Sequence, residues 1–204
     1  MEEWSVSLST AYEKAVQDMS SLVPSAVAAR TGAQFDGRAF TLKLFYRTFR
    51  IAFPAIAISE IGAQEPPPLW AQILLLHHLQ TADGTPVADH WIAFRELPGG
   101  RFFESSYMQQ SIAPLVERFG QDLDGFREAS RALGGTIMNR TGDAAFRFLA
   151  FPQMPIGCIL YLADDEMPAS VNIVFDESAS HNLPTEDVAV LTNYFSNLLI
   201  AFAD

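Results

Sequence analysis

One stretch of this sequence, LWAQILLLHHLQT at residues 69–81, predicts a helix that is buried on nearly every side. Its apolar residues do not keep to one helical face, so a helix here has almost no polar face to turn toward water. The run EPPP before it and the Asp83-Gly84 pair after it predict where the helix begins and ends. The rest of the chain must therefore fold around this helix.

Two adjacent histidines, His77 and His78, interrupt this apolar helix. Adjacent helical residues point about 100° apart, so the two imidazoles cannot serve one small site. They are not a helical metal pair, because such a pair needs a spacing of three or four residues. His77 shares a face with Trp70, Ile73 and Leu74, and this aromatic-lined face makes it the candidate ligand. The alternative is that His77 is a neutral core histidine with a satisfied hydrogen bond.

Alternation of apolar and polar residues with a period of two predicts two groups of strands. The stretch AFTLKLFYRTFRIAFPAIAIS, residues 39–59, predicts two or three antiparallel strands with turns near Tyr46–Arg47 and Pro54. The stretch HWIAFREL predicts a strand over 90–97 that ends at Pro98-Gly99-Gly100. Three further strands are expected at 145–151, 156–162 and 171–175, with ADDEMPAS as the last hairpin loop.

Helical periodicity and helix-terminating residues predict the remaining elements. We expect helices at about 4–20, at 24–30, from about Ile112 to Phe119, near 122–134 and from Pro184 to the end. Strands group together and helices group together, without regular βαβ alternation. This order predicts an α+β fold, a largely antiparallel sheet packed against several helices, in a single domain over 1–204 with N-terminal helices at about 1–32. We expect the 69–81 helix to pack against the sheet of the three late strands.

Charge and cysteine content exclude several classes of function. The formal net charge is -11 and the basic residues are scattered, which disfavours nucleic acid and anionic membranes as partners. The single cysteine, Cys158, cannot form an internal disulfide or a four-cysteine metal site. The first residues, MEEWSVSLST, do not resemble a signal peptide, and no apolar run is long enough for a membrane span. We therefore expect a cytoplasmic protein.

The stretch HWIAFRELPGG contains the strongest candidate for a binding site. On a strand, Arg95 and Glu96 point to opposite faces, and either side chain could line a pocket beside the glycine turn. An arginine there could bind a carboxylate or a phosphate in bidentate fashion. The alternative is an internal ion pair at the strand end. We also expect Arg95 and Asp176 to be largely buried and paired, since a charge among apolar strand residues needs a partner.

Two weaker candidates lie at the late hairpin. The acidic loop Asp164 to Glu166 could take a divalent cation, but it lacks the alternating ligands of a calcium loop and fits a solvated hairpin tip better. If Ala163 pairs with Ser170, the hairpin brings Cys158 near Asp176 and His181, which are the residue types of a thiol nucleophile with its base. A small buried thiol in mid-strand is the more ordinary interpretation of Cys158.

Six blocks in the region of His77 to Glu186 occur in a fixed order: LLLHHL, HWIAFRELPGG, LGG, FPQMPI, DDEMPASVNIVFD and LPTED. Together with AVAARTGAQFDG near the start, they resemble the domain-of-unknown-function family 3786 of bacterial and archaeal proteins. The positions that fit the family pattern are His77, Trp91, Phe94, Arg95, Glu96 and Asp176. His78 and Cys158 stand where the pattern has an aromatic and an aliphatic residue, so the resemblance implies no shared role for either.

The resemblance implies an association with anaerobes and with corrinoid and one-carbon metabolism. Some members carry an iron–sulfur segment, for which this chain lacks the cysteines. Our first hypothesis is a non-catalytic accessory protein that binds a cofactor, such as a corrinoid or another tetrapyrrole, or a partner. The expected cofactor-binding residues are His77, Trp91, Arg95, Glu96 and Asp176. The alternatives are a small hydrolase or transferase with a polar pocket near Arg95–Glu96, and a protein–protein adaptor.

Overall fold

The computed structural model describes residues 2–139 and 142–203, and side chains from residue 8 onward. Its contacts divide the chain into two compact units. Unit 1 comprises the residues up to 86 with 151–153 and 181–184, and unit 2 comprises 87–150, 154–180 and the residues from 185. Helices and two antiparallel sheets make up the units, which confirms the α+β class. The prediction of a single domain stays a prediction, since compactness alone does not test it.

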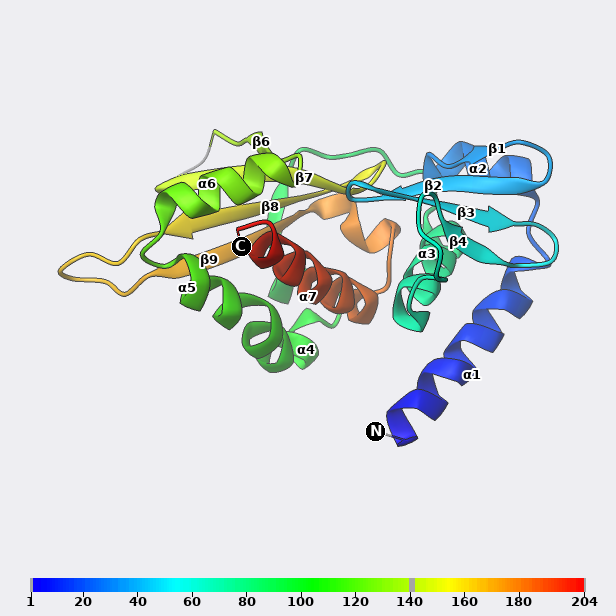
Figure 1. Ribbon diagram of the computed structural model, residues 1–204, viewed down its shortest axis with the longest axis horizontal. Helices are drawn as coiled ribbons and strands as arrows, with labels where there is room; N and C mark the ends of the chain where they lie inside the picture. The colour runs from blue at the N-terminus through cyan, green and yellow to red at the C-terminus, as the bar shows by residue number, and fades with distance from the viewer. Residues whose placement is uncertain (1, 140–141, 204) are drawn as a thin grey trace. The chain divides into compact units, whose positions relative to one another are not determined.

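Unit 1 contains three helices and a four-stranded antiparallel sheet with the strand order β1-β2-β3-β4 (Figure 1). The helices are α1 (Glu2–Met19), α2 (Pro24–Thr31) and α3 (Leu69–Thr81), and the strands are β1 (Gln34–Phe35), β2 (Ala39–Leu44), β3 (Arg47–Ala52) and β4 (Ile58–Glu60). The predicted bounds of these helices agree with the structure to within a few residues. The turn between β2 and β3 also lies where it was predicted, next to Tyr46.

Helix α3 is the most apolar element of unit 1, and most of its residues are buried, as its sequence predicts. Its main contacts are with α1 and α2, whose residues Ala15, Met19 and Val27 are buried. We had expected α3 on the sheet of the late strands, whereas the structure groups it with the first sheet. The physical reason is that the apolar faces of α1 and α2 also need a partner, and an all-round apolar helix supplies one.

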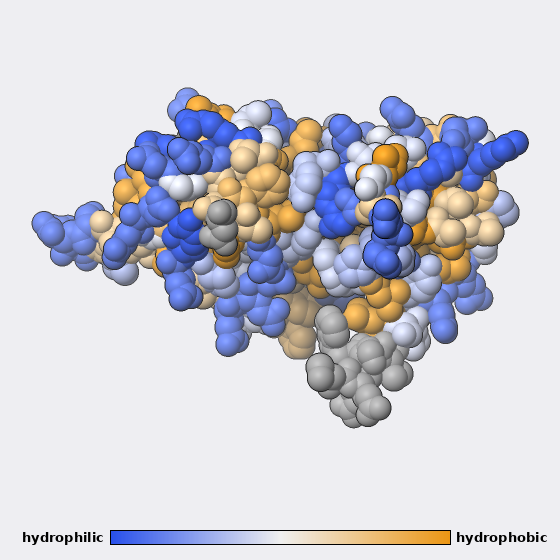
Figure 2. Space-filling model, viewed as in Figure 1, coloured by the Kyte–Doolittle hydropathy of each residue, from blue (hydrophilic) through white to orange (hydrophobic). Residues whose placement is uncertain are grey.

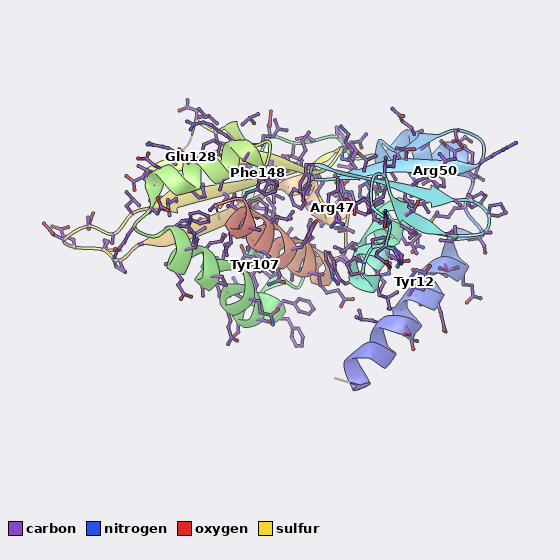
Figure 3. All side chains as sticks on the ribbon, in the orientation of Figure 1. Tyr12, Arg47, Arg50, Tyr107, Glu128 and Phe148 are labelled. Carbon is purple, nitrogen blue, oxygen red and sulfur yellow. The ribbon has the colours of Figure 1, made fainter. Side chains whose placement is uncertain are left out.

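Unit 2 contains a five-stranded antiparallel sheet with the order β5-β9-β8-β7-β6. The strands are β5 (Trp91–Ala93), β6 (Thr136–Ile137), β7 (Ala144–Phe151), β8 (Met154–Tyr161) and β9 (Ser170–Asp176), and the helices are α4 (Gly100–Tyr107), α5 (Ala113–Phe119), α6 (Leu123–Ala132) and α7 (Thr185–Ala201). Helix α7 packs on the sheet through Phe195, whose ring centroid lies 4.8 Å from that of Phe148 on β7 (Figure 3). Helix α6 adds Phe126 against Phe146.

The helix that we expected from about Ile112 to Phe119 is α5, which starts at Ala113, but the prediction missed the helical residues before it. Helix α4 continues through one π-helical segment, Met108–Ile112, into α5. Pro114 lacks an N–H, and its ring would clash with the carbonyl of Gln110 in a regular α-helix. The wider π turn accommodates the ring, and Asn193 donates to the Gln110 carbonyl oxygen at 2.7 Å. The proline therefore lies in the first turn of α5, directly after an irregular helical segment.

The late hairpin is shifted by two residues from the predicted register. Tyr161 lies opposite Ser170, and Cys158 lies opposite Ile173. A two-residue shift keeps every side chain on its predicted face. The loop runs over 162–169, and within it Asp164 closes a turn of its own, donating its N–H to the carbonyl oxygen of Met167 at 3.0 Å. The tip of this loop is mostly hydrophilic (Figure 2).

Candidate functional site

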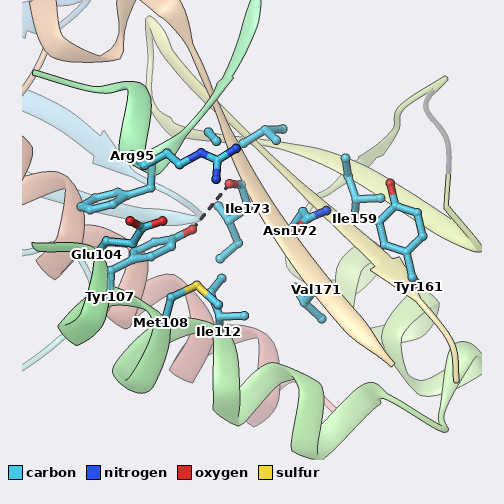
Figure 4. Close-up of a pocket in the computed structure, with 13 residues that line it drawn as sticks. Arg95, Glu104, Tyr107, Met108, Ile112, Ile159, Tyr161, Val171, Asn172 and Ile173 are labelled. Atoms are coloured by element: carbon cyan, nitrogen blue, oxygen red, sulfur yellow. Dashed lines mark hydrogen bonds between the residues drawn. The ribbon is translucent and has the colours of Figure 1, made fainter. Parts of the chain in front are cut away.

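Unit 2 holds a pocket of about 450 Å³ beside β9 (Figure 4). Its walls come from the end of β5 with the residues that follow, from α4 with the π segment, and from β8 and β9. The lining residues are Ala93, Phe94, Arg95, Glu104, Tyr107, Met108, Ile112, Ile159, Tyr161, Val171, Asn172, Ile173 and Val174. Most of these side chains are apolar or aromatic, and the charged ones are Arg95 and Glu104.

The pocket exists because β5 is shorter than its sequence predicts. We expected a strand over 90–97, but it ends at Ala93 and a 3-10 turn follows over Phe94–Glu96. The Ala93 N–H donates to Glu96 Oε2 at 2.7 Å, which holds this turn. Gly100 packs so closely on it that an added Cβ would lie 2.1 Å from the Phe94 carbonyl oxygen. The chain therefore leaves the sheet early and opens a gap beside β9.

Tyr107 forms the inner wall of the pocket. Its ring stacks on Phe94 with centroids 4.1 Å apart, and its hydroxyl donates to the Ile173 carbonyl oxygen at 3.5 Å. Burial, with a smaller contribution from Cys158, raises the pKa of Tyr107 above its usual value. Burial also raises the pKa of the Cys158 thiol. Both groups are therefore protonated at neutral pH, and Cys158 does not have the exposed, electropositive surroundings of a reactive thiol.

Arg95 lies at the mouth of this pocket, on the 3-10 turn. We expected it to be buried and paired, but it is exposed, and within residues 2–139 and 142–203 no carboxylate forms an ion pair with it. The expectation fails because the strand that would have buried Arg95 stops two residues earlier. Its guanidinium points over the pocket toward the Ile173 carbonyl (Figure 4). Glu96, Arg101 and Glu104 surround a shallower hollow next to it.

Asp176 is fully buried at the end of β9, opposite Trp91. Its Oδ1 accepts hydrogen bonds from the Ala88 N–H at 2.9 Å and from the Ser178 hydroxyl at 2.6 Å and N–H at 3.0 Å. Burial alone would raise its pKa, but these hydrogen bonds outweigh burial and keep the pKa of Asp176 below its usual value. The prediction that Asp176 is buried is confirmed, and Oδ1 is paired with hydrogen-bond donors in place of a cation, while Oδ2 forms no hydrogen bond with the described residues. It holds the junction of β9 with β5 and does not line the pocket.

Comparison with protein families identifies the group to which this chain is related. The model of a domain of unknown function, DUF3786, matches residues 23–198. The chain belongs to this family. No curated protein and no solved structure matches it. In the described part of the chain, none of the helices has the length and apolarity that crossing a membrane requires.

In this family member, the buried histidine of α3 is His78 and not His77. His78 is fully buried, stacks on Phe151 with centroids 4.0 Å apart, and has its Nε2 3.3 Å from the Thr31 carbonyl oxygen. Burial lowers the pKa of His78 to about 4, so the ring is neutral at pH 7. His77 is only partly buried. The face of α3 that carries His78, which we had judged less important, is the one that packs into the core.

The expected site residues are therefore only partly brought together. Arg95 lines the pocket, Glu96 supports it from the adjacent turn, and Trp91 and Asp176 form the strand pair behind it. His77 belongs to the other unit. The sequence did not single out Tyr107, Met108 or Asn172, because the helix that carries the first two was predicted to start too late. Asn172 carried no signal that distinguishes it from any exposed strand residue.

The acidic hairpin loop forms a turn in which Asp164 Oδ1 accepts from the N–H groups of Glu166 and Met167. These hydrogen bonds, outweighing a small effect of burial, lower the pKa of Asp164. Across residues 2–139 and 142–203 there is no group of three or more His, Cys, Asp or Glu side chains arranged to hold a metal ion. The loop is thus exposed at the hairpin tip and is shaped by backbone hydrogen bonds.

Proposed function

We propose that this protein is a non-catalytic binding protein, and that the pocket beside β9 takes a ligand with an apolar body and one anionic group. The observation that carries the proposal is the exposed guanidinium of Arg95 at the mouth of a mostly apolar pocket, in which Glu104 is the other charged lining residue. A site of this kind, in which apolar walls supply affinity and a few polar groups set orientation, supports an accessory role toward a cofactor or partner.

The lining supports an amphipathic acid as the ligand. The pocket volume falls within the range of about 300–1,000 Å³ that is usual for small-molecule sites. Met108, Ile112 and Ile159 supply apolar walls. A planar guanidinium binds a carboxylate through two parallel N–H···O bonds, which a lysine could not do with the same geometry. An apolar acid therefore satisfies both parts of the pocket.

The groups around the pocket favour binding over turnover. Tyr107 and Cys158 are buried and protonated, and Glu96 Oε2 is engaged by the Ala93 N–H. A hydrolase or transferase needs a nucleophile within hydrogen-bond reach of a base. No such pair is formed among the lining residues, all of which belong to the described part of the chain. The enzyme hypothesis would have to place its chemistry at the shallower hollow of Glu96 and Glu104.

The tetrapyrrole hypothesis has a different requirement. A metal-containing tetrapyrrole takes axial ligands from histidine, cysteine, methionine or tyrosine. Of these residue types the described pocket lining holds Tyr107, Met108 and Tyr161, whereas the exposed guanidinium of Arg95 fits an acid directly. An organic acid is therefore the ligand that we propose for this pocket. A protein partner is the second candidate, favoured by Phe102, which is 87% exposed on α4, the helix that also supplies Glu104 and Tyr107 to the pocket.

The proposal is tested with 1-naphthoate, and with naphthalene as the uncharged probe, by fluorescence titration of the whole chain. We expect naphthoate to bind better than naphthalene, and Arg95→Gln to weaken naphthoate by about tenfold. Arg131→Gln, an exposed arginine on α6, is the matched control and should leave the affinity unchanged. Equal binding of naphthoate by the two variants, or no binding by the parent protein, would overturn the proposal.

A further inference from the structure

The strand β9 has one edge that is only partly paired. It pairs with β8 from Ser170 to Phe175, but β5 covers its other edge only from Val174 to Asp176. Over Ser170–Ile173 that second edge has no strand partner among the described residues. The pocket lies along this gap, and residues 171–174 form its floor. Val171 and Ile173 are each only 3% exposed, so the site is an apolar hollow along a strand edge that has no strand partner but is covered by side chains such as Tyr107.

The backbone groups that face the gap can be identified. In an antiparallel pair, the N–H and C=O of one residue point to the same side, and successive residues alternate. Glu177 donates its N–H to the His90 carbonyl oxygen at 2.8 Å, so odd-numbered residues of this segment face β5. The hydrogen bond from the Tyr107 hydroxyl to the Ile173 carbonyl oxygen agrees with this alternation of odd and even residues. Val171 and Ile173 therefore present their peptide groups to the pocket.

We propose that the ligand is the carboxy-terminal segment of a protein, bound as an extended strand on the β9 edge with its terminal carboxylate on Arg95. This inference rests on the proposed function, because it uses the same apolar pocket and the same guanidinium. It adds a partner class: main-chain hydrogen bonds to a strand edge give affinity, and apolar walls receive alternate side chains. Figure 4 shows Tyr107 and Met108 on the helical side of β9, where such side chains would lie, and Ile159 across β9 from that edge.

The position of Arg95 selects a chain end over an internal segment. A strand added beside Ser170–Ile173 cannot continue past Ile173, because β5 and Phe94 occupy the edge from Val174 onward. The added chain must therefore begin, end or turn away from β9 at this point. A guanidinium there attracts a terminal carboxylate and repels a terminal ammonium group. The segment consequently ends at Arg95 and runs parallel to β9.

The length of the gap limits the segment. Four strand residues at about 3.3 Å each span about 13 Å, so three or four peptide residues fill the edge. Tyr107 must move for this pairing, because it is 5% exposed and its hydroxyl donates to the Ile173 carbonyl oxygen. This contact is 3.5 Å, the long limit of a hydrogen bond, and an incoming amide N–H would replace it.

The inference is tested with the hexapeptide Gly-Gly-Ser-Val-Thr-Leu, labelled with fluorescein at its amino end, as the free acid and as the carboxamide. We expect the acid to bind the parent chain about tenfold more tightly than the amide. Arg95→Gln should remove this discrimination, and Arg131→Gln should keep it. Hydrogen exchange of the Val171 and Ile173 amides should slow by about tenfold with the peptide but not with 1-naphthoate.

The outcomes separate the inference from the proposed function. If naphthoate binding depends on Arg95 but the peptide acid binds no better than its amide, the peptide inference is wrong and the proposed function stands. If the peptide binds without slowing exchange at Val171 and Ile173, strand addition is wrong. If neither probe binds the parent chain, both proposals fail together.

Discussion

Arginines beside the two sheets differ in whether they form ion pairs. On the first sheet, Arg47 forms a bidentate ion pair with Glu60 and lies over the Phe49 ring at 5.3 Å, and Arg50 pairs with Asp36 at 2.9 Å (Figure 3). Beside the second sheet, Arg95 has an apolar pocket in front of it and no ion pair within the described residues. An arginine next to a strand therefore has a structural role where a carboxylate pairs with it, and can bind an external anion where none does.

The largest expected effect concerns His78, the buried polar ring of unit 1. Its pKa of about 4 lies below the value of 6.5 for an exposed histidine, so the unfolded chain binds more protons between these pH values. The contribution of neutral His78 to the free energy of unfolding is fully present above pH 6.5. It falls by about 3 kcal/mol as the pH drops to 4. Urea unfolding of the parent and of His78→Phe across pH 4–7 measures it. The variant should lack this part of the pH dependence; identical curves would contradict it.

The second effect concerns the turn that opens the strand edge. Gly100→Ala should destabilise by about 2 kcal/mol, because its Cβ would collide with the Phe94 carbonyl oxygen and backbone must move. Ser105→Ala on the exposed side of α4 is the control and should change the free energy of unfolding by less than about 0.5 kcal/mol. Thermal unfolding measures both. A stable Gly100→Ala variant with unaltered naphthoate binding would mean that the turn tolerates relaxation and does not define the pocket.

The third effect compares the two arginines directly. Arg47→Ala should cost about 1–2 kcal/mol, since it leaves the carboxylate of Glu60, 17% exposed, without its partner. Arg95→Ala should stay within about 0.5 kcal/mol, because an exposed, unpaired arginine contributes little to folding. If Arg95 had been buried and paired, its replacement would have been expected to cause a larger loss of stability. Chemical unfolding of both variants decides the comparison, and an equal loss at the two positions would show that Arg95 is structural.

The sequence predicted elements better than their irregular ends. Periodicity located α3, the first sheet and the three late strands, because each pattern is local and its burial consistent. It missed the end of β5 at Ala93, since the Glu96 hydrogen bond and the packing on Gly100 that turn the chain there are tertiary contacts. It also missed α4 and the π segment before Pro114, because the π turn and the Asn193 hydrogen bond that let the helical path continue into α5 are not visible in the sequence.

The candidate site shows the same limit. Arg95 was singled out from sequence as a possible carboxylate ligand, and the structure places it at a pocket. The pocket itself could not be predicted, because it arises where the strand pattern fails. The choice of His77 over His78 failed for a related reason: an all-round apolar helix has no polar face, so its sequence does not tell which side enters the core.

Cys158, the chain's single cysteine, is completely buried, so its reaction with a thiol reagent can report local opening of the fold. A thiol reagent can reach this sulfur only when β8 separates from its neighbours, so the labelling rate of the unmodified chain reads out the population of open molecules. A ligand that binds only the closed form slows that labelling in proportion to its occupancy. A cysteine placed on the surface would, conversely, be modified selectively, and a dye could be attached there without any other substitution.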